Sequence, residues 1–557
     1  MEQSESHNQA SKTHRIILVL IVIIAYILRY VGHNWDSGFH FHPDERAIIM
    51  FADKIHFFDN LNPHFFSYGS LPIYLLKGFT QFSDAFFHTN LATYDGMLPV
   101  GRLMSVIWDT GTIYMVFIIT RHLFKKIQPA LIATALYATA FFPIQNSHFY
   151  VVDVPLNFFL SLMVYRLIIF IEKPRRRDAI WIGMIFGACL AIKVTPVIFG
   201  PFILAVFVYT FISKHKKTAI IYSLQTAVIF GIVSLLTYGL CMPYTFLDFK
   251  AFMSDMTQQI TMNSDPYIFP FTLQYVGTLP YLYYVKNIVL WGAGIPMILL
   301  SLFGLIRLYT LGKRIHKTHI LLALFYAYYF LIIGRSAVKF MRYMLPLYPF
   351  IAICAGVGAY YLWQKKGLAR WGGIFFLTAS VIWNMSFMTI YAAPQTRLTA
   401  SIWINQYIKP GSTLALEHWD DALPVYGGER YRFTEMTLYD RPDDEIKWQT
   451  LDQKLADTDY LIIASNRLYV PLQRLTDCNK YKACYPKTAV YYEQLFAGTL
   501  KGEGYEYKLE KEFAVYPTIP YSALLTGKPV EINDQSADES FTVYDHPRIL
   551  IFRNVMK

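Results

Sequence analysis

Long runs of apolar residues recur along the chain and end near residue 391. Each run approaches the roughly 20 residues that a helix needs to cross a lipid bilayer. Ten further runs and no small-residue cleavage site follow the first one, so we expect a retained span and not a signal peptide. The pattern predicts an α-helical polytopic membrane protein with about 11 transmembrane helices, at Ile16–Tyr30, Leu98–Leu123, Ile127–Ile144, Leu156–Ile171, Ala179–Ile192, Thr195–Ile212, Ala219–Leu240, Asn287–Leu308, Ile320–Gly334, Tyr343–Trp363 and Trp371–Tyr391.

Beyond residue 391 the apolar runs give way to a mixed polar sequence. Some segments have the character of β-strands: Thr413–Glu417, Tyr460–Ala464, Tyr505–Phe513 and Arg548–Phe552. Helical patterns lie at Leu398–Ile408, Trp448–Ala456 and Ala489–Ala497. The sequence therefore predicts a membrane domain over residues 1–391 and a C-terminal α/β domain over residues 392–557.

Clusters of Lys and Arg in the loops orient the chain, because such residues in short loops mark the cytoplasmic side of a membrane. With eleven spans and a cytoplasmic N-terminus, all six clusters fall on that side. The first outer loop, residues 33–97, and the C-terminal domain then lie outside the cytoplasm of a multi-pass protein of the cell membrane. The clusters are Lys12/Arg15, Arg121/Lys125/Lys126, Lys173/Arg175/Arg176/Arg177, Lys214/Lys216/Lys217, Lys313/Arg314/Lys317 and Lys365/Lys366/Arg370.

The composition agrees with a membrane protein. Of 557 residues, 54% are hydrophobic and 16% charged, against about 45–50% and about 25% in ordinary soluble domains. The basic loops and anionic lipid headgroups explain most of the net charge of +11. We therefore expect membrane lipids and no nucleic acid among the partners, and the absence of a phosphate-cradling glycine loop speaks against a nucleotide donor.

Two cysteines lie in the C-terminal domain, six residues apart. Cys478 and Cys484 can close a small disulfide loop in an oxidising compartment. Spacing alone does not establish the distance between them, so two free thiols remain the alternative.

Two adjacent carboxylates follow the first apolar run. Pro43 suits the first position of a helix, and Asp44 and Glu45 fall in its first turn. The helix dipole keeps a carboxylate there ionised, and an ionised carboxylate can accept a proton from an attacking hydroxyl. The alternative is that the pair only caps the helix.

Further charged residues fall on the same predicted outer side. Asp153 lies in the loop before Pro155, where it is either an N-cap or a functional acid at membrane depth. Lys193, Lys339 and Arg342 break the positive-inside pattern, and a cation in that place either binds an anion such as a lipid-borne phosphate or reaches out to the headgroups.

Asp44, Glu45, Asp153, Lys193 and Arg342 lie within motifs that resemble a known family. The motifs match bacterial polyprenyl-phosphate-dependent glycosyltransferases of the GT-C superfamily, which are related to protein O-mannosyltransferases and aminoarabinose transferases. In the membrane domain they are Phe41–Arg46, Asn62–Tyr74, Gly101–Leu103, Ser147–Pro155, Lys193 and Arg342–Pro349. In the tail they are Thr396–Ile404, Pro410–Ser412, Glu417–Asp421 and Phe541–Pro547.

The resemblance implies a GT-C fold and a role for each residue. The enzyme would move a hexosyl or pentosyl group from a polyprenyl-phosphate donor to a hydroxyl of an acceptor protein, glycan or lipid on the outer face. Asp44 would be the base, with Glu45 and Asp153 beside it in catalysis, and a single displacement would invert the anomeric carbon. Lys193, Arg342 and Lys339 would bind the donor phosphate; Tyr68, Arg102 and His148 would position acceptor or donor.

Two other interpretations are considered. A transporter or flippase of lipid-linked sugars also has many spans, but its ionisable groups usually lie near the bilayer midplane, and repeats are frequent. His40 and His42 with Asp44 form a weak metal motif without a distant third ligand, and relatives mostly need no catalytic metal, so we expect no cofactor. Asp109 is given no role, and Arg102 is the partner considered for it.

Overall fold

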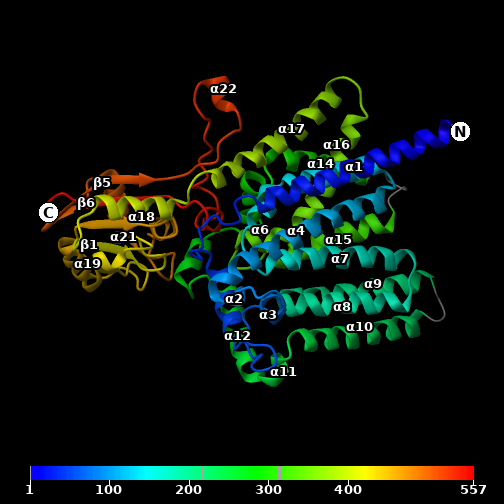
Figure 1. Ribbon diagram of the computed structural model, residues 1–557, viewed down its shortest axis with the longest axis horizontal. Coiled ribbons are helices and arrows are strands. Elements are labelled where there is room, and N and C mark those ends of the chain that lie inside the picture. The colour runs from blue at the N-terminus through cyan, green and yellow to red at the C-terminus, as the bar shows by residue number, and fades with distance from the viewer. Residues whose placement is uncertain (1, 215–218, 311–315) are drawn as a thin grey trace.

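The computed structural model describes residues 2–214, 219–310 and 316–557 (Figure 1). Four basic residues used to orient the chain lie outside these ranges: Lys216, Lys217, Lys313 and Arg314. Figure 1 shows a bundle of roughly parallel helices with a separate sheet domain at one end and the N-terminus at the opposite end. We call the first of these ends the sheet end.

The bundle is built from helices, and short helices also lie in the segments that connect them. They are α1 (Glu2–Tyr30), α2 (Pro43–Asp53), α3 (Ser70–Phe87), α4 (Tyr94–Phe124), α5 (Ile127–Thr139), α6 (Phe141–Ser147), α7 (Asp153–Glu172), α8 (Arg176–Ile192), η1 (Thr195–Ile198), α9 (Phe199–Lys214), α10 (Ala219–Cys241), α11 (Tyr244–Leu247), α12 (Phe249–Ser264), η2 (Pro270–Tyr275), α13 (Leu282–Asn287), η3 (Ile288–Gly292), α14 (Ile295–Thr310), α15 (Lys317–Ile333), η5 (Met341–Leu347), α16 (Tyr348–Trp363), α17 (Leu368–Met388) and η6 (Thr389–Ala392).

Within the described ranges, seven helices are long and apolar enough to cross a membrane, or nine if each of two bent pairs counts as one span. The bent pairs are α5 with α6, at 55°, and the helix Leu282–Gly292 with α14, at 117°. α8 and α15 have 17 residues each. All eleven predicted windows contain helix, so the helical polytopic class is confirmed, whereas a total of eleven spans is not.

Proline explains where both bent pairs break. Pro143 lies in the first turn of α6, and Pro296 lies in the first turn of α14. A proline ring clashes with the carbonyl four residues earlier, so the preceding helix ends there. These positions are Thr139, the last residue of α5, and Gly292, the last residue of η3.

The C-terminal part is an α/β domain, which confirms the predicted class. Its sheet has the order β2-β1-β3-β6-β5-β4, with β2, β1 and β3 parallel and the other neighbours antiparallel. The elements are α18 (Thr396–Tyr407), β1 (Thr413–Glu417), η7 (Gly428–Arg430), β2 (Arg432–Met436), α19 (Glu445–Asp457), β3 (Tyr460–Ile463), α20 (Val470–Arg474), α21 (Pro486–Ala497), β4 (Lys501–Gly502), β5 (Tyr505–Phe513), α22 (Ser522–Thr526), α23 (Glu539–Thr542) and β6 (Ile549–Asn554).

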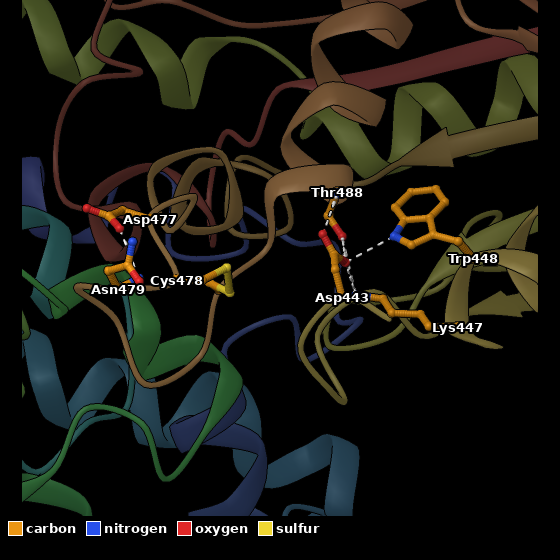
Figure 2. Close-up of a disulfide and its surroundings, with 8 residues drawn as sticks. Asp443, Lys447, Trp448, Asp477, Cys478, Asn479 and Thr488 are labelled. Carbon is orange, nitrogen blue, oxygen red and sulfur yellow. Dashed lines mark hydrogen bonds and ion pairs between the residues drawn. A yellow bond between two sulfur atoms is a disulfide. The ribbon is translucent and has the colours of Figure 1, made fainter. Parts of the chain in front are cut away.

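Cys478 and Cys484 form a disulfide in the structure, which closes a loop before α21. Figure 2 shows it near a buried network around Asp443. The Asp443 carboxylate accepts hydrogen bonds from Lys447 at 2.8 Å and from the Thr488 hydroxyl at 2.6 Å. The backbone N–H of Asp443 donates to the Cys484 carbonyl at 3.3 Å, so the disulfide loop and the start of α19 are held together.

The tail returns to the helical bundle after α22. Phe541 packs against Phe141 and Phe387, with ring centroids 5.7 and 5.5 Å away. Asp545 accepts hydrogen bonds from Gln145 at 3.0 Å and from the Tyr391 hydroxyl at 2.8 Å. The two parts of the chain therefore share an apolar and hydrogen-bonded junction, while the boundary between residues 391 and 392 stays a prediction.

Candidate active site

A cavity of about 1000 Å³ lies where the bundle meets the sheet domain. Its walls come from the first residues of α2 and α7, the segment after α8, α12, η5 and the sheet domain. Of the residues assigned a role from the sequence, the cavity is lined by Asp44, Tyr68, Asp153, Lys193 and Arg342. The fold thus brings together five side chains from four separate segments that the sequence predicts on the outer side.

Asp44 lies in the first turn of α2, where the sequence predicted a helix start. Its Oδ2 atom is 2.8 Å from Arg342 Nη1, and the Tyr68 hydroxyl hydrogen-bonds to the Asp44 carboxylate. Burial alone would raise the pKa of Asp44. The Arg342 charge, His42 and the Tyr68 hydrogen bond outweigh burial and lower that pKa below its usual value. Asp44 is therefore an ionised carboxylate that lines the cavity.

Asp153 and the two cations continue the arrangement. Asp153 is the first residue of α7, and Lys193 directly follows α8. Lys193 Nζ donates to Asp153 Oδ1 at 2.8 Å, and Arg342 Nε lies 3.7 Å from Asp153 Oδ2. Arg342 thus stands between two carboxylates, and acids alternate with cations from Asp44 to Lys193. Both cations pair with carboxylates of the chain in this structure, and their binding of a donor phosphate stays a prediction.

Glu45 and Arg102 belong to a second ion cluster. The Arg102 guanidinium donates to both carboxylate oxygens of Glu45, at 2.9 and 2.7 Å, and to both of Asp36, at 2.8 and 2.7 Å. The Tyr150 backbone N–H also donates to Glu45, at 2.9 Å. Arg102 is 1% exposed and Glu45 0%. Neither belongs to the described residues that line the cavity, so their roles in catalysis and positioning stay predictions.

His148 and Lys339 also lie apart from the described cavity wall. His148 is buried, with its ring nitrogens 2.9 Å from the Ile144 carbonyl and 2.7 Å from the Val31 carbonyl. Lys339 donates to the Ala337 carbonyl at 2.8 Å. In the structure both side chains make hydrogen bonds to nearby backbone carbonyls. The positioning role of His148 and the phosphate-binding role of Lys339 stay predictions.

Asp109 does not pair with Arg102. Its carboxylate accepts a hydrogen bond from Arg29 at 2.6 Å and another from the Tyr137 hydroxyl at 2.7 Å. Residues seven apart share one face of a helix but lie about 10 Å apart along its axis. Arg102 therefore meets the loop after α1, whereas Asp109 meets α1 and α5. This buried pair joins three helices of the bundle.

The sheet domain and the tail supply cavity residues to which the sequence assigned no role. Arg397 donates to Asp420 at 2.8 Å, and Arg46 of α2 donates to Asp421 at 3.2 Å. The charged residues and the tyrosine that this part supplies to the cavity are Arg397, Asp420, Asp421, Arg467 and Tyr544. All five except Arg467 lie in the tail motifs that resemble the GT-C family, and this resemblance was the signal available in the sequence.

The two histidines of the weak metal motif have other neighbours. His42 packs against the rings of Tyr544 and Phe149, with centroids 4.0 and 4.6 Å away, and burial lowers its pKa to about 3. His40 Nε2 lies 3.2 Å from Asp95 Oδ1. In the part of the chain that the structure describes, no group of three or more His, Cys, Asp or Glu side chains could hold a metal ion.

Three comparisons relate the chain to known proteins. A search of curated proteins finds no match. Among solved structures, the chain is similar to the oligosaccharyltransferase AglB of Archaeoglobus fulgidus, in complex with an inhibitory peptide and a dolichol-phosphate, at 11% identity, with 98% of this chain and 89% of that chain covered and a TM-score of 0.48. It is also similar to ArnT of Cupriavidus metallidurans bound to undecaprenyl phosphate, at 14% identity, with 82% and 94% covered and a TM-score of 0.44.

A family model matches the segment from α4 to α10, residues 93–238. Its description is dolichyl-phosphate-mannose-protein mannosyltransferase. The segment contains Asp153 and Lys193 of the cavity, whereas Asp44 and Arg342 lie outside it. Over this segment, about a quarter of the chain, the protein is similar to a mannosyltransferase family, which agrees with the resemblance of its motifs.

Proposed function

We propose that the protein transfers a sugar from a polyprenyl-phosphate donor to an acceptor hydroxyl at the outer face of the cell membrane, with inversion at the anomeric carbon. The observation that carries the proposal is the cavity in which Asp44, Asp153, Lys193 and Arg342 meet. Two carboxylates and two cations at one end of a membrane bundle supply both a proton acceptor and a site for a phosphate.

Asp44 acts as the base in this proposal. The acceptor oxygen forms a bond to the anomeric carbon while its proton passes to the Asp44 carboxylate. The bond from the anomeric carbon to the phosphate oxygen breaks, and the phosphate leaves with the electron pair. One displacement with one base requires no covalent sugar–enzyme species, so the configuration inverts.

Arg342 links the leaving group to the base. Its guanidinium is the charge that lowers the pKa of Asp44 most. A donor phosphate competes with Asp44 for that guanidinium, and as Arg342 turns toward the phosphate, Asp44 loses this effect and becomes a stronger base. Lys193, bound to Asp153 at 2.8 Å, supplies the second cation for the departing phosphate.

The orientation follows from the basic loops. The cavity and the sheet domain lie at the same end of the bundle, opposite the N-terminus (Figure 1). A cytoplasmic N-terminus places both outside, where acceptor proteins, glycans or lipids of the envelope are found. Protease added to right-side-out vesicles should cleave the sheet domain, and a protected domain would contradict this orientation.

The activity is tested with the full chain in liposomes. A polyprenyl-phosphate donor with a labelled sugar is added together with an envelope extract as acceptor. We expect the label to appear in acceptor material, free polyprenyl phosphate to accumulate, and NMR of the product to show the inverted anomer. Label that only crosses from one leaflet to the other would overturn the proposal in favour of a flippase.

A further inference from the structure

The α22 hairpin, residues 517–532, carries an exposed apolar tip. Tyr521, Leu524 and Leu525 at this tip are 81%, 82% and 90% exposed. Ile519 N–H donates to the Val530 carbonyl at 2.9 Å, so the two arms of the hairpin are joined. An apolar cluster of this kind, held out by an ordered hairpin, marks an interaction surface more often than chance exposure.

The hairpin is fixed at the sheet end of a membrane helix. The Thr518 N–H donates to the Thr389 hydroxyl at 2.9 Å, and Thr389 begins η6, directly after α17. Val515 and Ile532, on either side of the hairpin base, pack against the apolar core of the bundle. Figure 1 shows α22 projecting outward from the junction between the sheet and the bundle.

The helix that leads to the base of the hairpin, α17, is apolar and partly exposed. α17 is one of the apolar helices long enough to span a membrane, and its Phe375 and Ile382 are 65% and 44% exposed. The tip and this surface of α17 are thus both apolar and exposed, and the base of the hairpin is hydrogen-bonded to Thr389, directly after α17. Lys528 is exposed on the same hairpin and can pair with an anionic headgroup.

We propose that the tip of the α22 hairpin inserts into the lipid leaflet at the sheet end, with Tyr521 at the headgroup level and Leu524 and Leu525 in the acyl chains. Tyrosine is enriched at membrane interfaces because its ring is apolar and its hydroxyl is polar. Apolar residues flanked by a cation are the pattern of segments that lie in this interface. The insertion gives the sheet domain a second attachment to the membrane, in addition to the chain connection through α17.

Fluorescence quenching in liposomes tests the insertion directly, without an activity assay. The full chain carries Cys241→Ser, which leaves Cys189 and Cys354 buried, and an environment-sensitive dye is attached through Leu524→Cys. The matched control is Leu509→Cys on β5, which is 49% exposed on the sheet domain. Ile382→Cys on α17 is the lipid-facing reference.

We expect nitroxide lipids to quench the dye at position 524 several-fold more strongly than at position 509, and aqueous iodide to show the reverse order. Adding Leu525→Asp should move the dye at position 524 toward the behaviour of the control. Equal quenching by iodide at positions 524 and 509, with position 382 protected, would overturn the proposal. Protection from iodide without quenching by nitroxide lipids would also overturn it, because the tip would then be covered by protein.

Discussion

Asp44 and Glu45 are neighbours in the sequence but belong to ion clusters with different properties. The cavity cluster has two acids and two cations, and the side chains of Asp44 and Arg342 are 18% and 12% exposed. The sealed cluster has two acids and one cation, with side chains 0–1% exposed. The cavity cluster consists of Asp44, Asp153, Lys193 and Arg342; the sealed cluster consists of Asp36, Glu45 and Arg102.

The difference follows from helix geometry. Successive residues of an α-helix point about 100° apart, so two adjacent carboxylates in one turn face different neighbours. Asp44 lines the cavity, where in the proposed reaction the donor phosphate competes for its partner Arg342, whereas Glu45 is held by a guanidinium that two carboxylates already occupy. A cluster open to the cavity is suited to chemistry, and a sealed cluster is suited to holding α2 on α4.

Asp44→Asn gives the strongest test of the difference between the cavity cluster and the sealed cluster. We expect transfer to fall by about 10²–10⁴-fold, because the amide cannot accept the proton, while unfolding in detergent changes little. The matched control is Asp95→Asn. Asp95 is the second residue of α4, as Asp44 is of α2, but its side chain is 88% exposed. Near-normal transfer by the Asp44 variant would move the role of base to another residue of the cavity cluster.

Arg102→Met should affect stability and not chemistry. It leaves Asp36 and Glu45 buried without their cation, and removal of one partner of a buried pair costs about 3–5 kcal/mol. We expect a lower unfolding temperature in detergent, with the transfer rate per folded molecule unchanged. A folded variant with a normal unfolding temperature and slow transfer would place Arg102 in the reaction after all.

Hydropathy predicted most of the helical architecture, because the free energy of transfer into a bilayer depends on local composition. β1 and β5 also have their predicted bounds. β2 was missed because it is a largely exposed edge strand without an alternating apolar pattern. The bends at Pro143 and Pro296 were not predicted either, since an apolar run does not show its direction.

The predicted topology placed the charged candidate residues at one end of the bundle, and four of them do line one cavity there. It does not predict which face of a helix a residue occupies. The sealed cluster into which the Arg102 guanidinium points was therefore not predicted, and the positioning role that the resemblance implies for Arg102 stays a prediction. Arg467 was missed for a related reason: it reaches the cavity only through the packing of the sheet domain on the bundle.

Lys193→Met sharpens the comparison within the cavity cluster. We expect kcat/KM for the donor to fall by an amount equivalent to roughly 2–4 kcal/mol, because in the proposal this cation meets the charge on the leaving phosphate. Lys339→Met is the matched control, because Lys339 donates to a backbone carbonyl away from the described cavity wall. Equal losses in both variants would show that position in the cavity does not determine phosphate binding.

Glu45→Gln is the smallest change, and its pH dependence separates the two clusters. Burial raises the pKa of Glu45, and the Arg102 charge only partly offsets this. Because the folded pKa lies above the unfolded value, the folded state binds the proton more tightly, and the stability gained by Glu45 declines as pH rises through the folded pKa. The Gln side chain does not titrate and still accepts from Arg102, so we expect a destabilisation of only about 1 kcal/mol, largest at acidic pH and smaller at alkaline pH.

Unfolding temperatures of both proteins measured from pH 4 to pH 9 check this, and transfer per folded molecule should stay close to the starting value. A transfer loss as large as that of Asp44→Asn, with an unchanged pH profile of stability, would mean that Glu45 takes part in the chemistry and that the sealed cluster opens during the reaction.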